Sequence, residues 1–133
     1  MNGVIHISDI GETVAAIVLL FTQDRIQGTG YPRPVSLGRF LCSLLPSSLS
    51  GPLEEGAGAS KHMQNLWDNG HLKFNHFVRV TEMPTLEKLR EAFERAAGIL
   101  PPLGYKGADI LIPVALARGK MSFLLIQVKN RQV

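Results

Sequence analysis

Three polar residues interrupt the apolar C-terminal segments of this chain. Asp109 opens the apolar run 109–114, and Gln127 and Lys129 close a second run over 123–130. Side chains alternate faces along a strand, so Gln127 and Lys129 share one face of a strand. A carboxylate, an amide and an ammonium brought together could hold a metal ion and a water against a phosphodiester.

The spacing between the two runs decides whether these groups can meet. Residues 117–120 are mostly polar and contain glycine, which predicts a turn between antiparallel strands. A turn centred on Arg118 sets Asp109 opposite Gln127, and a turn centred one residue later sets it opposite Lys129. A loop of even length would send the Asp109 carboxylate to the other face. The register therefore tests the hypothesis.

A simpler interpretation competes with this one. Asp109 follows Gly107 and suits a turn at the start of a strand, while Gln127 and Lys129 suit a strand leaving the sheet. The residues between them are almost purely apolar, which indicates strands buried on both faces. A buried lysine needs a partner or a function, so their joint placement favours chemistry.

The same segments carry a resemblance to a known superfamily. The motifs are Gly-Ala-Asp-Ile-Leu-Ile-Pro-Val at 107–114 and Met-Ser-Phe-Leu-Leu-Ile-Gln-Val-Lys-Asn at 121–130, with further matches in 74–80 and 11–20. They resemble the C-terminal block of a large group of uncharacterised fungal proteins, which is similar to the nuclease-like domains of Crinkler-type effectors. The block is identified as a member of the PD-(D/E)XK, restriction-endonuclease-like superfamily. The resemblance covers most of the chain.

The resemblance implies a role for each polar residue. Asp109 would be a metal ligand, Gln127 stands where Glu or Asp is usual, and the carbonyl of Val128 would be a further ligand. Lys129 would orient the attacking water or offset charge in the transition state. The metal would be Mg²⁺ or Mn²⁺, held weakly because Gln127 carries no negative charge. The implied activity is that of a metal-dependent nucleic-acid phosphodiesterase or a degenerate relative. The alternative is a non-catalytic interaction or dimerisation module on the same scaffold.

A further acid is expected on the helix before the sheet in many superfamily members. Glu12 is the best match, because it stands at the start of an apolar helical run. Asp9 and Glu12 also have the spacing of a capping box, in which both side chains satisfy free backbone amides. Glu87, Glu91 and Glu94 are weaker matches and are most simply a solvated helix face.

The element order predicts an α/β or α+β class, with N-terminal helices and a three-stranded mixed or antiparallel sheet ending in a hairpin. The superfamily core runs helix, three strands, helix, strand, so the resemblance implies a partial core that lacks its closing helix and strand after Lys129. Three explanations compete for this truncation. They are a minimal version of the fold, a homodimer that supplies the missing layer, and a truncated gene copy.

The charge distribution bears on partners. The formal net charge is +3, and the cations after Arg95 face a single acid, Asp109. They are Lys106, Arg118, Lys120, Lys129 and Arg131. Such a basic third would steer a nucleic acid toward the site. Lysines and arginines at a hairpin tip also serve solubility alone, and both interpretations stay open.

Composition sets the remaining limits. With 133 residues and 45% apolar content, the chain predicts one domain over residues 1–133 with a core of its own. The single cysteine, Cys42, lies in an apolar run and is expected to be a buried thiol in a reducing compartment. No signal peptide or membrane-spanning segment is expected, which favours the cytoplasm or nucleus.

Hydrophobic periodicity and turn residues predict the other elements. They are a buried helix over 10–23, a helix over 35–45 capped by Ser36, a mobile loop over 46–62, a strand over 72–80, and a helix over 85–97. His76 is expected in the core of the strand. Thr85 caps the last helix, and Gly98 stops it.

Overall fold

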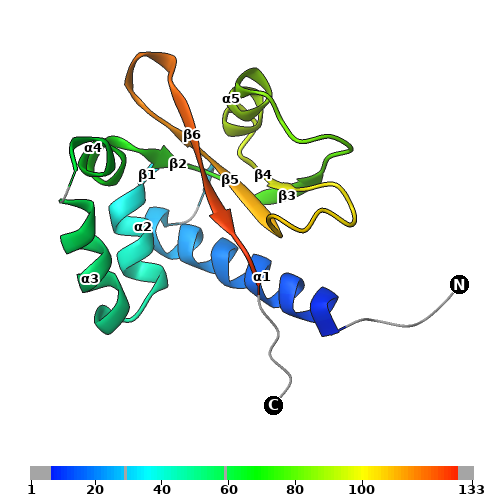
Figure 1. Ribbon diagram of the computed structural model, residues 1–133, viewed down its shortest axis with the longest axis horizontal. Coiled ribbons are helices and arrows are strands. Elements are labelled where there is room, and N and C mark those ends of the chain that lie inside the picture. The colour runs from blue at the N-terminus through cyan, green and yellow to red at the C-terminus, as the bar shows by residue number, and fades with distance from the viewer. Residues whose placement is uncertain (1–6, 29, 59, 129–133) are drawn as a thin grey trace, which may run out of the picture.

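The computed structural model describes residues 7–28, 30–58 and 60–128, with side chains described from residue 11 onward. It is a mixed α+β fold (Figure 1). The helices are α1 (Ile7–Gln27), α2 (Leu37–Leu44), α3 (Ser47–Ala57), α4 (Lys61–Asn69) and α5 (Leu86–Glu94). The strands are β1 (Val35–Ser36), β2 (His71–Leu72), β3 (His76–Arg79), β4 (Ala97–Leu100), β5 (Ile110–Ala115) and β6 (Met121–Ile126).

The sheet is larger than the three strands expected. Its order is β1-β2-β5-β4-β3, with β6 paired to β5, and only β3 and β4 run parallel. β1 and β4 lie outside the expected strands and are two and four residues long, too short for a periodic pattern to reveal them. The terminal hairpin was predicted correctly, and of the two sheet types left open, mixed or antiparallel, the sheet is mixed.

β5 is the central strand, although it contains Pro113. On the side away from β6, β4 pairs at Leu111 and β2 pairs at Ala115. Pro113 stands between these two contacts, where β5 changes neighbours. A proline has no N–H to donate and normally disrupts a central strand. Here the missing donor falls at the gap between β4 and β2.

The β5–β6 hairpin has the odd register centred on Arg118. Its pairs run from Ile110 opposite Ile126 to Ala115 opposite Met121. Arg118 (φ 61°) and Gly119 (φ 72°) are both left-handed within the short 3-10 turn that joins the strands. This is one of the two registers that the polar trio required.

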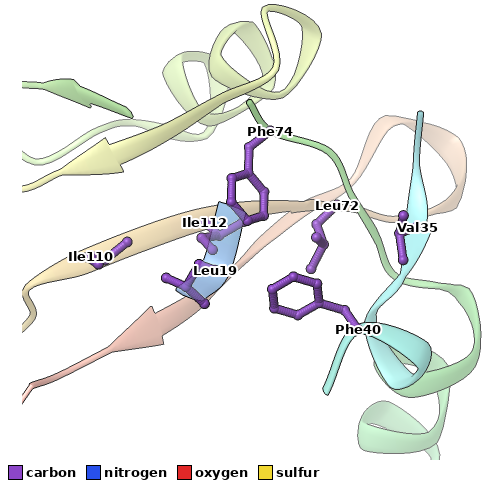
Figure 2. Packing of buried hydrophobic residues seen from close by; sticks show 7 residues of the cluster. All are labelled: Leu19, Val35, Phe40, Leu72, Phe74, Ile110 and Ile112. Atoms are coloured by element: carbon purple, nitrogen blue, oxygen red, sulfur yellow. The ribbon is translucent and has the colours of Figure 1, made fainter. Parts of the chain in front are cut away.

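The two faces of the sheet carry separate cores. Leu19 of α1 and Phe40 of α2 pack with Ile110 and Ile112 on one face, and Figure 2 shows them converging with Phe74. The rings of Phe40 and Phe74 meet edge to face, with centroids 5.9 Å apart. On the other face, Leu89 of α5 packs with Ile99 and Leu111. Alternation along β5 thus separates α1 and α2 from α5.

The expectation that the first helix is buried all round is wrong. α1 presents Leu19 to the sheet, whereas Val14, Ile17, Val18 and Phe21 are 45–70% exposed. Only one face of a helix can meet a sheet, so a helix that is apolar all round leaves its other face uncovered. α1 also begins at Ile7, so Asp9 lies inside the helix and is not its N-cap.

The expected loop over 46–62 is mostly helical. α3 and the start of α4 occupy it, and Ser60 caps α4 by accepting a hydrogen bond from the Met63 backbone N–H at 3.1 Å. Neighbouring helices stabilise the segment despite its Gly and Pro. α4 places Trp67 so close to Gly38 that an added Cβ would lie 2.6 Å from the indole nitrogen. Tertiary packing overrides the composition.

The expected strand over 72–80 divides into β2 and β3, which pair with different strands. His76 is exposed, and its Nδ1 lies 2.6 Å from Asn75 Oδ1, so the core prediction for this histidine is wrong. Cys42 is also exposed, contrary to expectation. α2 is amphipathic, and Cys42 lies on the side of the helix away from the core residue Phe40.

For α5 the predicted N-cap is correct and the predicted C-terminal end is wrong. Thr85 accepts a hydrogen bond from the Lys88 N–H at 3.3 Å, as expected. α5 ends at Glu94, and Ala96 turns the chain with φ 56°. Gly98 is not a helix stop but a β4 residue opposite Phe77, whose ring would lie 2.5 Å from an added Cβ.

Candidate functional site at the open end of the hairpin

The start of β5 and the end of β6 position the predicted polar residues. The ladder ends at Ile110 opposite Ile126, and the register centred on Arg118 then sets Asp109 opposite Gln127. Asp109 is a bend residue just before β5, and its side chain reaches Val128 on the far side of Gln127. The structure therefore brings two of the three polar residues together. Lys129 lies outside the described residues.

Asp109 has a clear structural role. Its backbone N–H donates to the Ile126 carbonyl at 2.9 Å, and its carboxylate oxygen Oδ2 accepts the backbone N–H of Val128 at 2.5 Å. The carboxylate thus takes the place of a main-chain acceptor where the ladder stops. The side chain is half-buried. A charged acceptor makes this a strong bond, which fastens the end of β6 to the start of β5.

The hydrogen bonds of Gln127 and Val128 use their N–H groups. The Gln127 amide donates from Nε2 to the Lys106 carbonyl across a long 3.4 Å, and its side chain is exposed. The Val128 N–H donates to Asp109, and this bond does not involve the Val128 carbonyl, the atom expected as a metal ligand. Two local hydrogen bonds thus link the end of β6 to the segment that precedes β5.

The acids that a metal would require do not gather there. Within residues 7–28, 30–58 and 60–128, no group of three or more His, Cys, Asp or Glu side chains could hold a metal. Glu12 is half-buried on α1, which packs on the opposite face of the hairpin from α5. Asp109 is the expected acid whose hydrogen bonds place it at the open end. Mg²⁺ prefers several hard oxygen ligands, so one carboxylate forms a poor site.

The basic residues divide between the two ends of the hairpin. Arg118 and Lys120 stand at the tip, exposed, and Arg90 of α5 reaches the same tip by donating to the Gly119 carbonyl at 2.6 Å. Lys106 lies near Gln127 at the open end. Strands of six residues separate the ends by about 20 Å at a rise of ~3.3 Å per residue. Arg131 lies outside the described residues.

A cleft that the sequence did not predict lies beneath α5. It encloses about 540 Å³ between α5, β3 and β4, with Val78, Met83 and Ile99 in its wall and Arg79 and Arg95 at its margin. Arg79 is anchored there by donating to the Pro101 carbonyl at 2.7 Å. The cleft depends on the parallel pairing of β3 with β4, for which no local sequence signal exists.

The fold and the site define a mixed α+β protein with a β5–β6 hairpin. At the open end of this hairpin the Asp109 carboxylate bonds to the Val128 N–H. Over residues 1–133 the chain belongs to the family described as Domain of unknown function (DUF8736). No curated protein and no solved structure shows a significant match to it. Among the described helices, none combines the length and apolar character needed to cross a membrane.

Proposed function

We propose that this chain is a nuclease-like scaffold that serves as a non-catalytic interaction module. The observation that carries the proposal is the use of the Asp109 carboxylate as the acceptor for the Val128 N–H. An acid occupied in this way stabilises the hairpin and has one oxygen left for a metal. The order α5, β4, β5, β6 supports the nuclease-like ancestry, because it follows the helix and three strands of that core.

The charge of the site also favours binding over hydrolysis. A phosphodiesterase of this type needs ligands that collect a divalent cation and a lysine that assists the water. The described part of the hairpin, residues 106–128, carries Lys106, Arg118 and Lys120 against Asp109 alone. At the open end Lys106 and Asp109 carry opposite charges, and Gln127 adds no negative charge, so this end attracts a divalent cation only weakly.

The decisive experiment is a cleavage assay on single-stranded DNA, double-stranded DNA and RNA with Mg²⁺ or Mn²⁺. The wild type is compared with Asp109→Ala and Lys129→Ala. We expect no metal-dependent product from any of the three proteins. Product that depends on metal in the wild type and disappears in both variants would contradict the proposal.

One observation favours the second candidate, a metal-dependent nucleic-acid phosphodiesterase. The odd register sets Asp109 opposite Gln127, as such a site requires. In that case Asp109 Oδ1, the Gln127 amide oxygen and a phosphate oxygen would hold a weakly bound Mg²⁺ or Mn²⁺. Asp109→Asn discriminates the two functions, because it keeps a hydrogen-bond acceptor for Val128 and removes the charge that a metal needs.

A further inference from the structure

β6 is an unusually apolar edge strand. Its residues 121–126, Met-Ser-Phe-Leu-Leu-Ile, contain no charge and no proline. Among the described strands it pairs only with β5, whereas β5 has neighbours on both sides. Figure 1 shows it as the long arrow toward the C-terminal end, in orange and red. Proteins normally protect such edges with charge, proline, bulges or a covering element.

The pattern of hydrogen bonds between β5 and β6 shows which backbone N–H and C=O groups of β6 point away from β5. The Leu116 N–H donates to the Lys120 carbonyl at 2.8 Å, so this pair is hydrogen-bonded. Hydrogen-bonded and non-hydrogen-bonded pairs alternate in an antiparallel ladder. The even residues of β6 therefore bond to β5. Met121, Phe123 and Leu125 direct their backbone N–H and C=O groups to the outer side of β6, here called the free edge.

Side chains reinforce this free edge. Phe123 is 50% exposed and Leu125 is 47% exposed. No residue of β6 is fully buried, whereas every residue of β5 except Ala115 is buried. An added strand would cover both apolar side chains and pair their backbone groups. Extended peptides bind exposed sheet edges in this way, with main-chain hydrogen bonds supplying affinity.

The charges at the two ends of the hairpin select the partner. Lys106 stands at the open end, and Arg118 and Lys120 stand at the tip. A second copy paired antiparallel would set Arg118 and Lys120 of each molecule toward the end of the other that carries Lys106, with Asp109 already bonded to Val128. Nucleic acid would satisfy the cations but offers no regular row of backbone N–H and C=O groups. An extended polypeptide with acidic ends satisfies both requirements.

We propose that the free edge of β6 binds an extended, acidic polypeptide segment as an additional strand. The inference rests on the proposed interaction function and names its partner. The segment carries small or β-branched residues where it crosses Phe123 and Leu125. Its acidic residues flank that stretch and meet Lys106 at one end and Arg118 and Lys120 at the other.

The test measures binding of a fluorescent nine-residue peptide, Glu-Glu-Val-Thr-Val-Thr-Val-Glu-Glu, by anisotropy. The control peptide has Lys in place of Glu. We expect the acidic peptide to bind the wild type, and the basic peptide to bind at least about tenfold more weakly. A double substitution, Arg118→Glu with Lys120→Glu, should narrow or reverse this preference. Equal binding of both peptides would overturn the charge argument.

A matched pair of variants tests the edge itself. Leu125→Thr keeps the outward N–H, whereas Leu125→Pro removes it and leaves the even-numbered bonds to β5 in place. We expect Leu125→Pro to weaken binding about tenfold beyond Leu125→Thr. Equal affinities of the two variants would overturn the edge proposal. Because a proline variant can misfold, hydrogen exchange of the wild type provides a second test: the Phe123 and Leu125 amides should slow when the acidic peptide binds, and unchanged exchange would overturn the proposal.

Sedimentation and competition identify other occupants. If the wild type is a dimer without peptide and Leu125→Pro dissociates it, the occupant of the free edge is a second copy of the chain. If DNA displaces the bound peptide and slows exchange of the Phe123 amide, the occupant of the free edge is nucleic acid. Both results overturn the proposal. Failure of the proposed function is distinguishable, because metal-dependent cleavage would refute that function while leaving the peptide measurements unaffected.

Discussion

Replacement of Asp109 separates a structural carboxylate from a catalytic one. In Asp109→Ala the Val128 N–H loses its only acceptor among the described residues, at the point where the ladder ends. A hydrogen bond to a charged group contributes about 1.5–3 kcal/mol, and half-burial reduces this to about 1 kcal/mol here. For a domain of 133 residues that loss lowers the melting temperature by about 3–5 °C.

The measurement is urea unfolding in the presence of EDTA, repeated with excess Mg²⁺. Asp109→Asn is the matched variant, because its amide oxygen still accepts the Val128 N–H, and it should retain about half of the stability that Asp109→Ala loses. We expect added Mg²⁺ to change none of these values. Equal stability of wild type and Asp109→Ala in EDTA, together with Mg²⁺ stabilisation of the wild type alone, would refute the structural role.

Three further outcomes follow from packing and exposure. Gly98→Ala should lower the free energy of unfolding by about 1–3 kcal/mol, because its Cβ would meet the Phe77 ring at 2.5 Å. Phe77→Leu should recover part of this loss in a double-mutant cycle. Gly51→Ala is the control and should not destabilise the protein, because the space at its Cβ is open. Phe40→Ala should cost about 3–5 kcal/mol in chemical denaturation, because the ring is fully buried. Cys42 should react with a thiol reagent in the folded protein at nearly its unfolded rate, and a protected thiol would contradict its exposure.

The hairpin and the short set of registers open to it are the part of the site that the sequence could predict. Two apolar runs and a four-residue polar turn left few pairings open, and strand alternation limited the useful ones to odd registers. The observed register, centred on Arg118, is one of those two. Local spacing was sufficient because the two strands are adjacent in the chain.

The hydrogen bond that decides the role of Asp109 could not be predicted. It depends on the ladder stopping at Ile110, so that the Val128 N–H is left for a side chain to satisfy. The sequence also did not show that the basic side chains divide between the two ends of the hairpin. Lys106 and Arg118 are near in sequence, yet a whole strand separates them in space.

Segments with a cap or a strong turn were also readable from the sequence. Ser36 and Thr85 cap α2 and α5 as predicted, because an N-cap needs only its own side chain and an amide three residues ahead. The helices within residues 46–62 could not be predicted from the sequence, because neighbouring helices rather than local propensity stabilise them.

The sequence by itself determined the mixed α+β class, the terminal hairpin and the capped helices, because these depend on periodicity and contacts a few residues apart. Only the tertiary structure decided which face of α1 is covered, that Gly98 belongs to a strand beside Phe77, and that β6 pairs with β5 alone among the described strands. Those outcomes depend on pairing between distant segments, which no local pattern records. The chemistry of the hairpin follows the same division: the residues are set by sequence, and the acceptor role of Asp109 is set by where the sheet ends.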